Sequence, residues 1–464
     1  MLTYMLDRRG KLPVYDYLYR CIRKDILSGT LKAGERLPSK RELAQQLGVS
    51  VVTVTNAYAQ LSAEGFLRTE ERRGYFVNPV EHVEPKRAKK PAENEEKQDG
   101  SRFYLMDFKT NEVEGERFPF SVWSRLMRRV LSERQEELLK ATGAKGIWPL
   151  RKAISDYLYR SRGMEAGPEQ IVVGAGTEYL YNLIAQLLGK EKVYGVEDPG
   201  YRKVAQVYGV NGLSVRYIGM DGQGVSPEEL RETDTDVMHL SPSHHFPTGV
   251  VTPVGRRQAL LRWAEEKKSR FLLEDDYDSE FRFTGRPIPT LQSMDRTGKV
   301  LYVNTFSKTL APSFRISYLV LPETLLPEYE ERLGFYACTV PSLEQYTLAA
   351  MIEEGHLERH IGRMKTFYRE KRDKVIEAIR QSPLGEKVRI LEADAGLHFL
   401  LELPTVRSDE ELRQAAAEEG IRLSFLSAYV HGAHRAEEHR MVINYSGIDL
   451  KKLPECLEKL AALL

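Results

Sequence analysis

Residues 300–321 read VLYVNTFSKTLAPSFRISYLVL, and this stretch decides how most of the chain is interpreted. Its two apolar runs, 300–303 and 316–320, have the length and the β-branched and aromatic residues of buried strands. Between them Lys308 is surrounded by hydroxyl side chains, and Arg315 follows it. A lysine just beyond a buried strand is a candidate for a Schiff base with an aldehyde, although most lysines are solvated surface groups.

Further apolar runs of strand length precede this stretch, and amphipathic segments such as 258–267 lie between them. These runs are 171–173, 192–196, 237–240 and 271–273. The alternation predicts an α/β domain with a mostly parallel sheet and helices on both faces. Ligands of such sheets bind at the carboxyl ends of the strands, so the residues just after each run are candidates for a binding site.

Three more motifs follow strand-like runs. Gly174-Ala-Gly-Thr177 predicts a phosphate cradle at a helix N-terminus, or else a turn required by packing. In Glu274-Asp-Asp-Tyr-Asp278, one carboxylate would hold a protonated ring nitrogen and the phenol would bind a phenolate oxygen. The alternative for that segment is an acidic metal site or a solvated turn. Tyr201, in Asp198-Pro-Gly-Tyr201, would stack on a flat ring or simply pack at a turn.

Taken together, the four motifs fit a phosphate, a pyridinium, a phenolate and an aldehyde, which are the groups of pyridoxal 5′-phosphate (PLP). Their order resembles that of the fold-type I aminotransferases. The resemblance implies that Lys308 forms the imine with the cofactor, and that Asp275 holds the ring nitrogen, with Glu274 and Asp276 competing for that role. It implies further cofactor contacts from Tyr277 (phenolate), Tyr201 (stacking) and, around the phosphate, Ala175, Gly176, Thr177, Thr305, Ser307 and Arg315. The ring-contacting asparagine of this class falls at Phe246, so we expect that contact to be lost.

The charge of the chain is unevenly distributed. The 464 residues include 68 basic and 67 acidic side chains, a formal net charge of +1. Residues 1–80 hold 13 basic and 8 acidic groups, whereas residues 101–464 hold 50 and 53. The segment 81–100 has 11 charges and Val83 as its only large aliphatic residue, which is typical of a linker. We therefore expect a basic domain (1–80), a flexible polar linker (81–100), a large PLP-binding domain (101–335) and a small α+β C-terminal lobe (336–464).

The basic domain has a helix-turn-helix pattern. Apolar residues at helical spacing predict a helix within 12–29, a second helix over 41–47 capped by Ser39, and a third from Ser50 to about Ala63. Residues 66–77 alternate and reverse at a basic tip, which predicts a β-hairpin wing.

The segment LPSKRELAQQLGVS, residues 37–50, resembles the winged helix-turn-helix of GntR-type bacterial regulators. The resemblance implies double-stranded DNA as a partner. It places Lys40, Arg41, Ser50, Thr53 and Thr55 against DNA, with Arg72 and Arg73 in the minor groove or on phosphates. Val51 stands where many relatives have arginine, and it offers no hydrogen bond to a base. The alternative is a structural three-helix module whose charges are solvated.

A GntR-type reader joined to an aminotransferase-like domain resembles the MocR/GabR family of transcription regulators. PSHHFPTG (242–249), EDDYDSEFRF (274–283) and TFSKTLAPSFRISYLVLP (305–322) carry this resemblance. It implies a head-to-tail homodimer on an operator with two half-sites. Our hypothesis is that an amine-bearing effector (an amino acid, a small peptide or a related amine) forms an external aldimine and releases Lys308. Vitamin B6 itself is the alternative signal.

An active aminotransferase is the competing interpretation. Such enzymes commonly bind the substrate carboxylate with a late arginine. In this chain, Ile443 and Asn444 occupy the strand where we expect it, and the segment 425–429 has none. Arg202 and Arg440 remain candidates for an effector carboxylate. We therefore expect at most residual transamination, and we do not expect γ-aminobutyrate as the ligand.

The cysteines and the apolar runs indicate in which cellular compartment the protein is expected. Cys21, Cys338 and Cys456 are widely spaced, which argues against a disulfide framework and against a cysteine metal site. We expect no metal ion. The start, Met1–Gly10, lacks the apolar core of a signal peptide, and no apolar run is long enough for a membrane span. We therefore expect a cytoplasmic protein.

Overall fold

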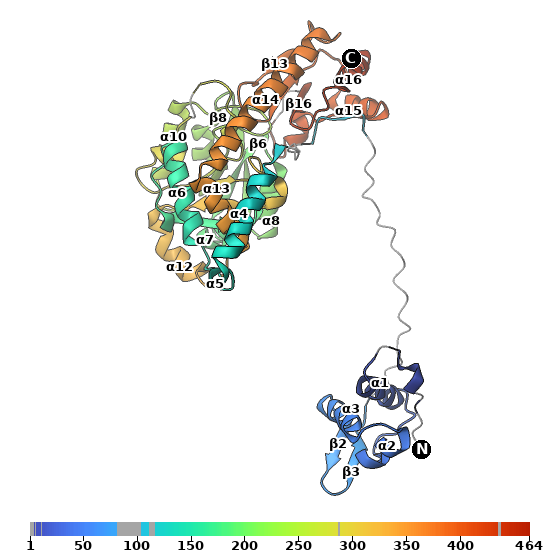
Figure 1. The fold of residues 1–464 in the computed structure, drawn as a ribbon. Helices are drawn as coiled ribbons and strands as arrows, with labels where there is room; N and C mark the ends of the chain where they lie inside the picture. Colours follow the sequence, from blue (N-terminus) through green and yellow to red (C-terminus); the bar gives the residue numbers. More distant parts are fainter. Residues whose placement is uncertain are drawn as a thin grey trace. The chain divides into compact units, whose positions relative to one another are not determined.

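The chain folds into two compact units, Met1–Ser101 and Arg102–Leu464, in a computed structural model (Figure 1). The residues that the structure describes are 4, 6–10, 12–80, 104–110, 117–285, 288–434 and 438–464. The predicted linker, 81–100, lies outside the described residues, so each unit is described by itself.

The N-terminal unit has the predicted winged helix-turn-helix. Its elements are α1 (Val14–Leu27), β1 (Arg36–Leu37), α2 (Lys40–Leu47), α3 (Val51–Ala63), β2 (Leu67–Glu70) and β3 (Gly74–Val77). Ser39 and Ser50 begin α2 and α3 as expected, because each Oγ accepts a backbone N–H three residues later at 3.2 Å. The strand β1 was not predicted; it joins the hairpin in the order β1-β3-β2.

The core of this unit packs α1 and α3 against each other. Leu18 and Ile22 of α1 and Val54 and Leu61 of α3 are fully buried. The hydroxyl of Tyr58, also on α3, donates to the backbone oxygen of Pro38 at 3.0 Å. These contacts fix α3 relative to the turn that precedes α2.

The C-terminal unit is built on the predicted, mostly parallel sheet. Its order is β5 (Ile171–Gly174), β12 (Ser317–Val320), β11 (Val300–Thr305), β10 (Phe271–Asp275), β9 (Val237–Leu240), β6 (Val193–Asp198), β7 (Ser214–Asp221) and β8 (Gly224–Val225). Neighbours from β11 to β7 pair in parallel, whereas β12 is antiparallel to both β11 and β5. The short β8 is antiparallel to β7.

Helices cover both faces of this sheet, because successive strand side chains point to opposite faces. Val303 packs with α7 (Thr177–Leu188), α8 (Arg202–Val210) and α12 (Leu326–Leu333). Its neighbour Tyr302 packs on the other face with α4 (Phe120–Glu133), α6 (Trp148–Arg162) and α13 (Ser342–Glu353). Further helices of this domain are α5 (Gln135–Leu138), α9 (Pro227–Glu232), α10 (Val254–Glu265) and α11 (Leu291–Met294).

A smaller lobe follows the long helix α14 (His356–Gln381), which extends from the sheet domain into the lobe (Figure 1). Its sheet has the order β13 (Arg389–Leu391), β14 (His398–Glu402) and β16 (Arg440–Asn444). The helices α15 (Asp409–Glu418) and α16 (Leu453–Leu463) pack with it. Short 3-10 helices lie at Leu6–Arg9, Pro168–Gln170, Ser279–Phe281, Pro312–Phe314, Glu323–Leu325 and Leu426–Tyr429.

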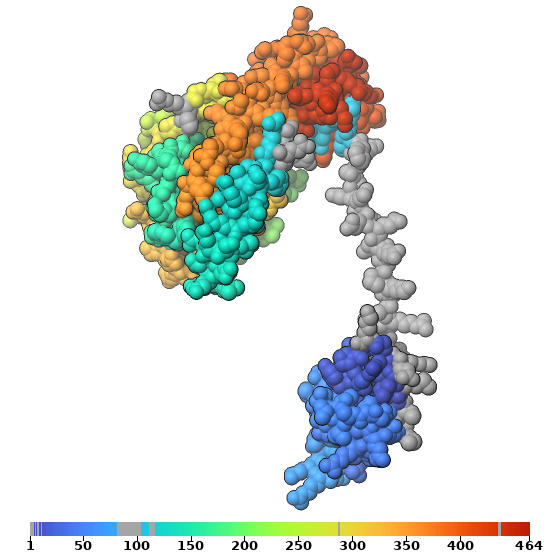
Figure 2. Space-filling view, viewed as in Figure 1, coloured from blue at the N-terminus to red at the C-terminus, as the bar shows by residue number. Residues whose placement is uncertain are grey.

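Two segments pack with the domain on the other side of the boundary predicted at residue 336. The position of this boundary stays a prediction. The strand β4 (Met106–Asp107) pairs in parallel with β15 (Ile421–Arg422) of the small lobe. Figure 2 shows this early segment, in cyan, beside the red C-terminal segments. Conversely, α13 packs with the core of the large sheet domain. Among the described residues, no helix is long and apolar enough to cross a membrane.

Candidate functional site

The candidate site lies along one edge of the large sheet. The strands β5, β6, β9, β10 and β11 run in one direction, so their carboxyl ends lie along the same edge. These ends are Gly174, Asp198, Leu240, Asp275 and Thr305. Lys308 lies in the turn that follows β11. The fold therefore brings the four predicted motifs to the same edge, as the topology of an open α/β sheet requires.

Lys308 has the protonation properties of a nucleophile. Burial lowers the pKa of its ammonium group to about 8, and the negative charge of Asp278 opposes this shift. A substantial fraction of the side chain is therefore an unprotonated amine slightly above neutral pH. Attack on an aldehyde requires this form of a lysine.

The three consecutive carboxylates at the end of β10 have different surroundings. Glu274 accepts the backbone N–H groups of Leu291 and Gln292, each at 3.0 Å. Oδ2 of Asp276 accepts hydrogen bonds from Arg162 and Tyr302, both at 2.7 Å. The carboxylates of Glu274 and Asp276 lie on the same face of the sheet. Donors from the protein already satisfy most of their hydrogen-bonding capacity.

Asp275 points to the other face, toward α7. Its Oδ2 accepts a hydrogen bond from the hydroxyl of Tyr181, and Nε2 of His239 lies 3.4 Å from the same oxygen. Its Oδ1 is buried and has no partner. Oδ1 of Asp276 also lacks a hydrogen-bond partner, but the guanidinium of Arg162 neutralises the charge of that carboxylate. A buried carboxylate oxygen without a donor is costly, and a protonated pyridine nitrogen would satisfy it. The site thus fits PLP.

Tyr277 lies beside a histidine and an aspartate. Its Oη is 3.4 Å from Nδ1 of His244. Burial and the negative charge of Asp278 raise the pKa of this phenol well above its ordinary value. Tyr277 therefore remains a hydrogen-bond donor, as its predicted contact with a phenolate oxygen requires.

The predicted phosphate cradle lies at the N-terminus of α7, which begins at Thr177. Gly176 has φ of +97°, and a Cβ added there would overlap Nη2 of Arg315. The N–H of Ala175 donates to Oγ1 of Thr339 at 3.0 Å. The cradle thus combines small residues and helix N–H groups, which is the environment that a phosphate ester prefers.

Hydroxyl groups and an arginine complete this cradle. Oγ1 of Thr305 bonds Oγ of Ser307 at 2.9 Å and Oγ of Ser317 at 2.8 Å. Nη2 of Arg315 lies 2.5 Å from Oε2 of Glu178. Burial raises the pKa of Glu178, but hydrogen bonds from Lys203 and Arg315 outweigh it and lower the pKa to about 2. A phosphate would therefore share Arg315 with an ionised glutamate.

Tyr201, the residue predicted to stack on the cofactor ring, packs against Phe246. The Tyr201 ring is 54% exposed and meets Phe246 edge-on, with ring centroids 6.0 Å apart. Phe246 also contacts His398 and Tyr429, at centroid distances of 5.1 and 5.2 Å. The residue expected to replace the asparagine thus joins an aromatic cluster. Stacking by Tyr201 stays a prediction.

The two arginines proposed for an effector carboxylate are placed differently. Arg202 is exposed at the start of α8, next to Tyr201. Arg440 begins β16 and lies 3.5 Å from Glu402. The other end of that strand, Asn444, pairs with His398. The structure therefore does not bring Arg440 to the residues around Phe246.

The predicted DNA contacts lie on α2, α3 and the wing. Arg41, Ser50, Arg72 and Arg73 are exposed, whereas Lys40, Thr53 and Thr55 are half-buried. Arg73 is paired with Glu70 at 2.7 Å, and the Lys40 ammonium lies 5.2 Å from the centre of the Tyr75 ring. Arg72 occupies the tip of the hairpin with φ of +58°. Val51 is 44% exposed at the start of α3.

Several residues of the site were missed from the sequence. They are Tyr181 and His239 beside Asp275, Arg162 beside Asp276, and His244 and His398 beside Tyr277 and Phe246. Only His244 had a signal, because it lies within the PSHHFPTG motif. Tyr181 and Arg162 are 94 and 114 residues from their carboxylates, and no local pattern indicates such pairs.

Comparison with known proteins divides the chain in the same way. Residues 14–77 match the bacterial regulatory proteins of the gntR family, and residues 104–460 match the aminotransferase class I and II family. The probable rhizopine catabolism regulatory protein MocR of Rhizobium meliloti is 33% identical over 98% of this chain and 94% of its own length. The chain belongs to the MocR/GabR family.

Other relatives agree with this assignment to MocR-type regulators. YdeL of Bacillus subtilis, an uncharacterized HTH-type transcriptional regulator, is 35% identical over 99% of both chains. PdxR of Corynebacterium glutamicum, a pyridoxine biosynthesis transcriptional regulator, is 30% identical over 89% of this chain and 87% of its own. The multiple substrate aminotransferase of Thermococcus profundus covers 78% of this chain and 92% of its own, with 25% identity and a TM-score of 0.69. This MocR-type chain is thus a PLP-dependent, DNA-binding transcription regulator.

Proposed function

We propose that this regulator senses an amine-bearing metabolite (an amino acid, a small peptide or a related amine) through Lys308. The observation that carries the proposal is the pairing of a half-buried lysine, whose pKa is lowered to about 8, with a buried Asp275 oxygen that lacks a partner. These are the protein groups that an exchangeable imine on a protonated pyridine ring requires.

Each side chain has a defined task in this proposal. When bound, PLP supplies an electrophilic aldehyde carbon. Asp275 would hold a proton on the ring nitrogen, and the Tyr277 phenol would donate to the phenolate oxygen. The N-terminus of α7, together with Thr305 and Arg315, would hold the phosphate.

Lys308 is the group that changes when the effector binds. The effector's amine would take the place of the Lys308 amine at the aldehyde carbon. The displaced amine would then lie near Asp278 and near His398 of the small lobe, because its charge acts on Asp278 and His398 in this structure. A change at this boundary would favour one of two arrangements of the sheet domain and the small lobe.

The reader domain would convert this change into altered DNA binding. We propose a head-to-tail homodimer in which two reader domains bind two half-sites of an operator in the cytoplasm. Large exposed aromatic side chains on the C-terminal unit, Phe120 (66% exposed) and Phe335 (76%), support an interface between chains.

Two other functions have specific support. The similarity to PdxR, which is named for pyridoxine biosynthesis, favours vitamin B6 itself as the signal. The lysine and aspartate of the site favour an aminotransferase. Turnover of an amino donor and a keto acceptor at ~1 s⁻¹ or faster would show that the protein is an active aminotransferase.

The effector is found by titrating the cofactor-loaded protein with amino acids, dipeptides and amines while recording the cofactor's absorbance. We expect one chemical class to change the spectrum at low concentration. If PLP alone, and none of the amines, changes the affinity of the protein for DNA, vitamin B6 is the signal and the amine proposal is wrong.

A further inference from the structure

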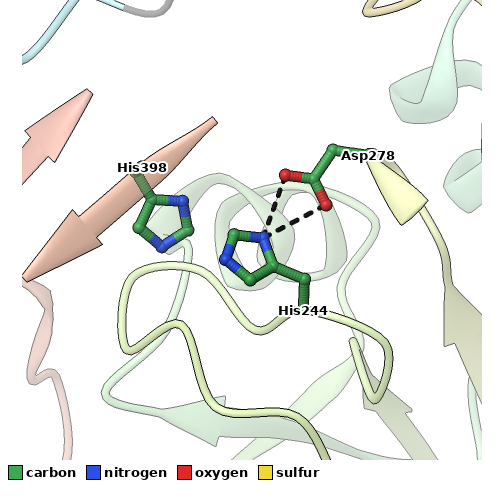
Figure 3. A group of neighbouring side chains, drawn as sticks. All are labelled: His244, Asp278 and His398. Atoms are coloured by element: carbon green, nitrogen blue, oxygen red, sulfur yellow. Dashed lines mark hydrogen bonds and ion pairs between the residues drawn. The ribbon is translucent and has the colours of Figure 1, made fainter. Parts of the chain in front are cut away.

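Three buried side chains outside the predicted cofactor contacts meet where the sheet domain and the small lobe come together (Figure 3). His244 follows β9, Asp278 follows β10, and His398 begins β14 of the small lobe. Figure 3 shows that the three converge, with His244 between the other two. His244 and His398 are each 2% exposed, and so is Asp278. Residues from three distant parts of the chain are thus buried together.

The contacts within this cluster leave nitrogen atoms unsatisfied. Nδ1 of His244 lies 2.9 and 3.2 Å from the two carboxylate oxygens of Asp278. The imidazole rings of His244 and His398 have centroids 4.4 Å apart. Nε2 of His244 and Nε2 of His398 are both buried without a hydrogen-bond partner. A buried nitrogen without a partner is costly, and a ligand at Nε2 of His398 would relieve that cost.

The backbone is shaped around this cluster. Gly396 has φ of +67°, a conformation that favours glycine. A Cβ added there would overlap Cε1 of His244 and would lie 2.6 Å from Oδ2 of Asp278. The main chain therefore approaches the two side chains as closely as it can, and no larger residue fits at position 396.

We propose that His244, Asp278 and His398 bind a divalent transition-metal ion. Each offers one ligand atom, and these atoms all lie within 4.8 Å of one another. From His244 the ligand atom would be Nδ1, which faces Asp278 and would exchange its present hydrogen bond for the ion. Two imidazoles and a carboxylate are ligands that Zn²⁺, Fe²⁺ and Co²⁺ accept. A tetrahedral ion with ligands at ~2.0–2.2 Å separates its ligand atoms by roughly 3.3–3.6 Å, so modest ring rotations close the site.

The ion would have room for one more ligand. Three protein ligands leave one position of a tetrahedral ion open, as in catalytic zinc sites. Binding of the ion does not depend on the effector, so a failure of this proposal would leave the amine-sensing proposal intact.

The test uses the full-length, cofactor-loaded protein with Zn²⁺ alone or Co²⁺ alone. The protein is treated with a chelator, mixed with the ion, passed through a desalting column and analysed for metal content. We expect one ion per chain, and we expect His398→Gln and Asp278→Asn to lower the affinity at least tenfold. The matched control is His356→Asn, on the partly exposed start of α14, which should bind the ion as the parent does.

A second measurement needs no variant, in case His398→Gln does not fold. The zinc X-ray absorption spectrum of the parent protein should show two imidazole ligands. Three results would overturn the proposal. They are parent protein that retains no ion, a folded His398→Gln protein that retains the ion fully, and a spectrum without imidazole scattering.

Discussion

The hydroxyl of Tyr181 donates to Oδ2 of Asp275, while Oδ1 of the same carboxylate is buried without a partner. This geometry orients one oxygen and leaves the other for a ligand. Asp275→Asn removes the negative charge but keeps the shape. Since a hydrogen bond to a charged group contributes ~1.5–3 kcal/mol, we expect PLP to bind roughly tenfold or more weakly. The measurement is a titration of cofactor-free protein with PLP, and unchanged affinity would contradict the role of Asp275.

The neighbouring Asp276 should behave differently. Its carboxylate pairs with Arg162 at 2.7 Å, and both side chains are nearly inaccessible. Asp276→Asn leaves a buried guanidinium without its counter-charge, which costs about 3–5 kcal/mol. Urea unfolding of the cofactor-free protein should show this loss for Asp276→Asn and a smaller one for Asp275→Asn. Equal losses would mean that the two carboxylates have the same task.

The rate of imine formation should depend on pH in a defined window. Because burial lowers the pKa of Lys308 to about 8, its reactive amine is mostly protonated below pH 8 and mostly unprotonated above it. The initial rate at which cofactor-free protein reacts with PLP should therefore rise with pH and level off above about 8. A rate that continues to rise toward pH 10.5 would show an ordinary, solvated lysine.

Binding of DNA should weaken with salt through the exposed arginines. Arg72, at the tip of the wing, has no carboxylate partner within the described part of the chain, whereas Arg73 is paired with Glu70. Arg72→Ala should lower affinity for all sequences and reduce the salt slope by about 1. Arg389→Ala, in the other unit, is the control. Fluorescence anisotropy with operator DNA at several salt concentrations measures both, and an unchanged slope in Arg72→Ala would remove this residue from the DNA surface.

Local patterns predicted the helices and the hairpin of the DNA-binding domain, six strands of the large sheet and the sheet edge that carries the site. The caps at Ser39 and Ser50 and the strand before Lys308 are encoded within a few residues, so periodicity and capping rules find them. The sheet then brings separate strand ends together, because parallel strands share an edge. For the same reason, Asp275 and Lys308 could be assigned to one site from sequence.

Contacts between distant segments could not be predicted. The pairing of Met106 with Ile421 joins residues more than 300 positions apart, and neither strand is longer than two residues. The unsatisfied nitrogens of His244 and His398 depend on the approach of the small lobe to the sheet, which no local pattern encodes. The resemblance favoured Asp275 over Glu274 and Asp276, but the contacts of Tyr181 and Arg162 that distinguish these carboxylates were not predicted.

The central claim is that chemistry at Lys308 controls DNA binding. The most direct test measures operator affinity with and without an amine that changes the cofactor's spectrum, in the parent protein and in Lys308→Ala. The variant should lack the absorbance at ~410–430 nm that is typical of the lysine imine. We predict that the amine changes operator affinity of the parent at least fivefold, a typical coupling between sites, and has no such effect on Lys308→Ala. An amine that changes the spectrum but leaves operator affinity unchanged would contradict the account.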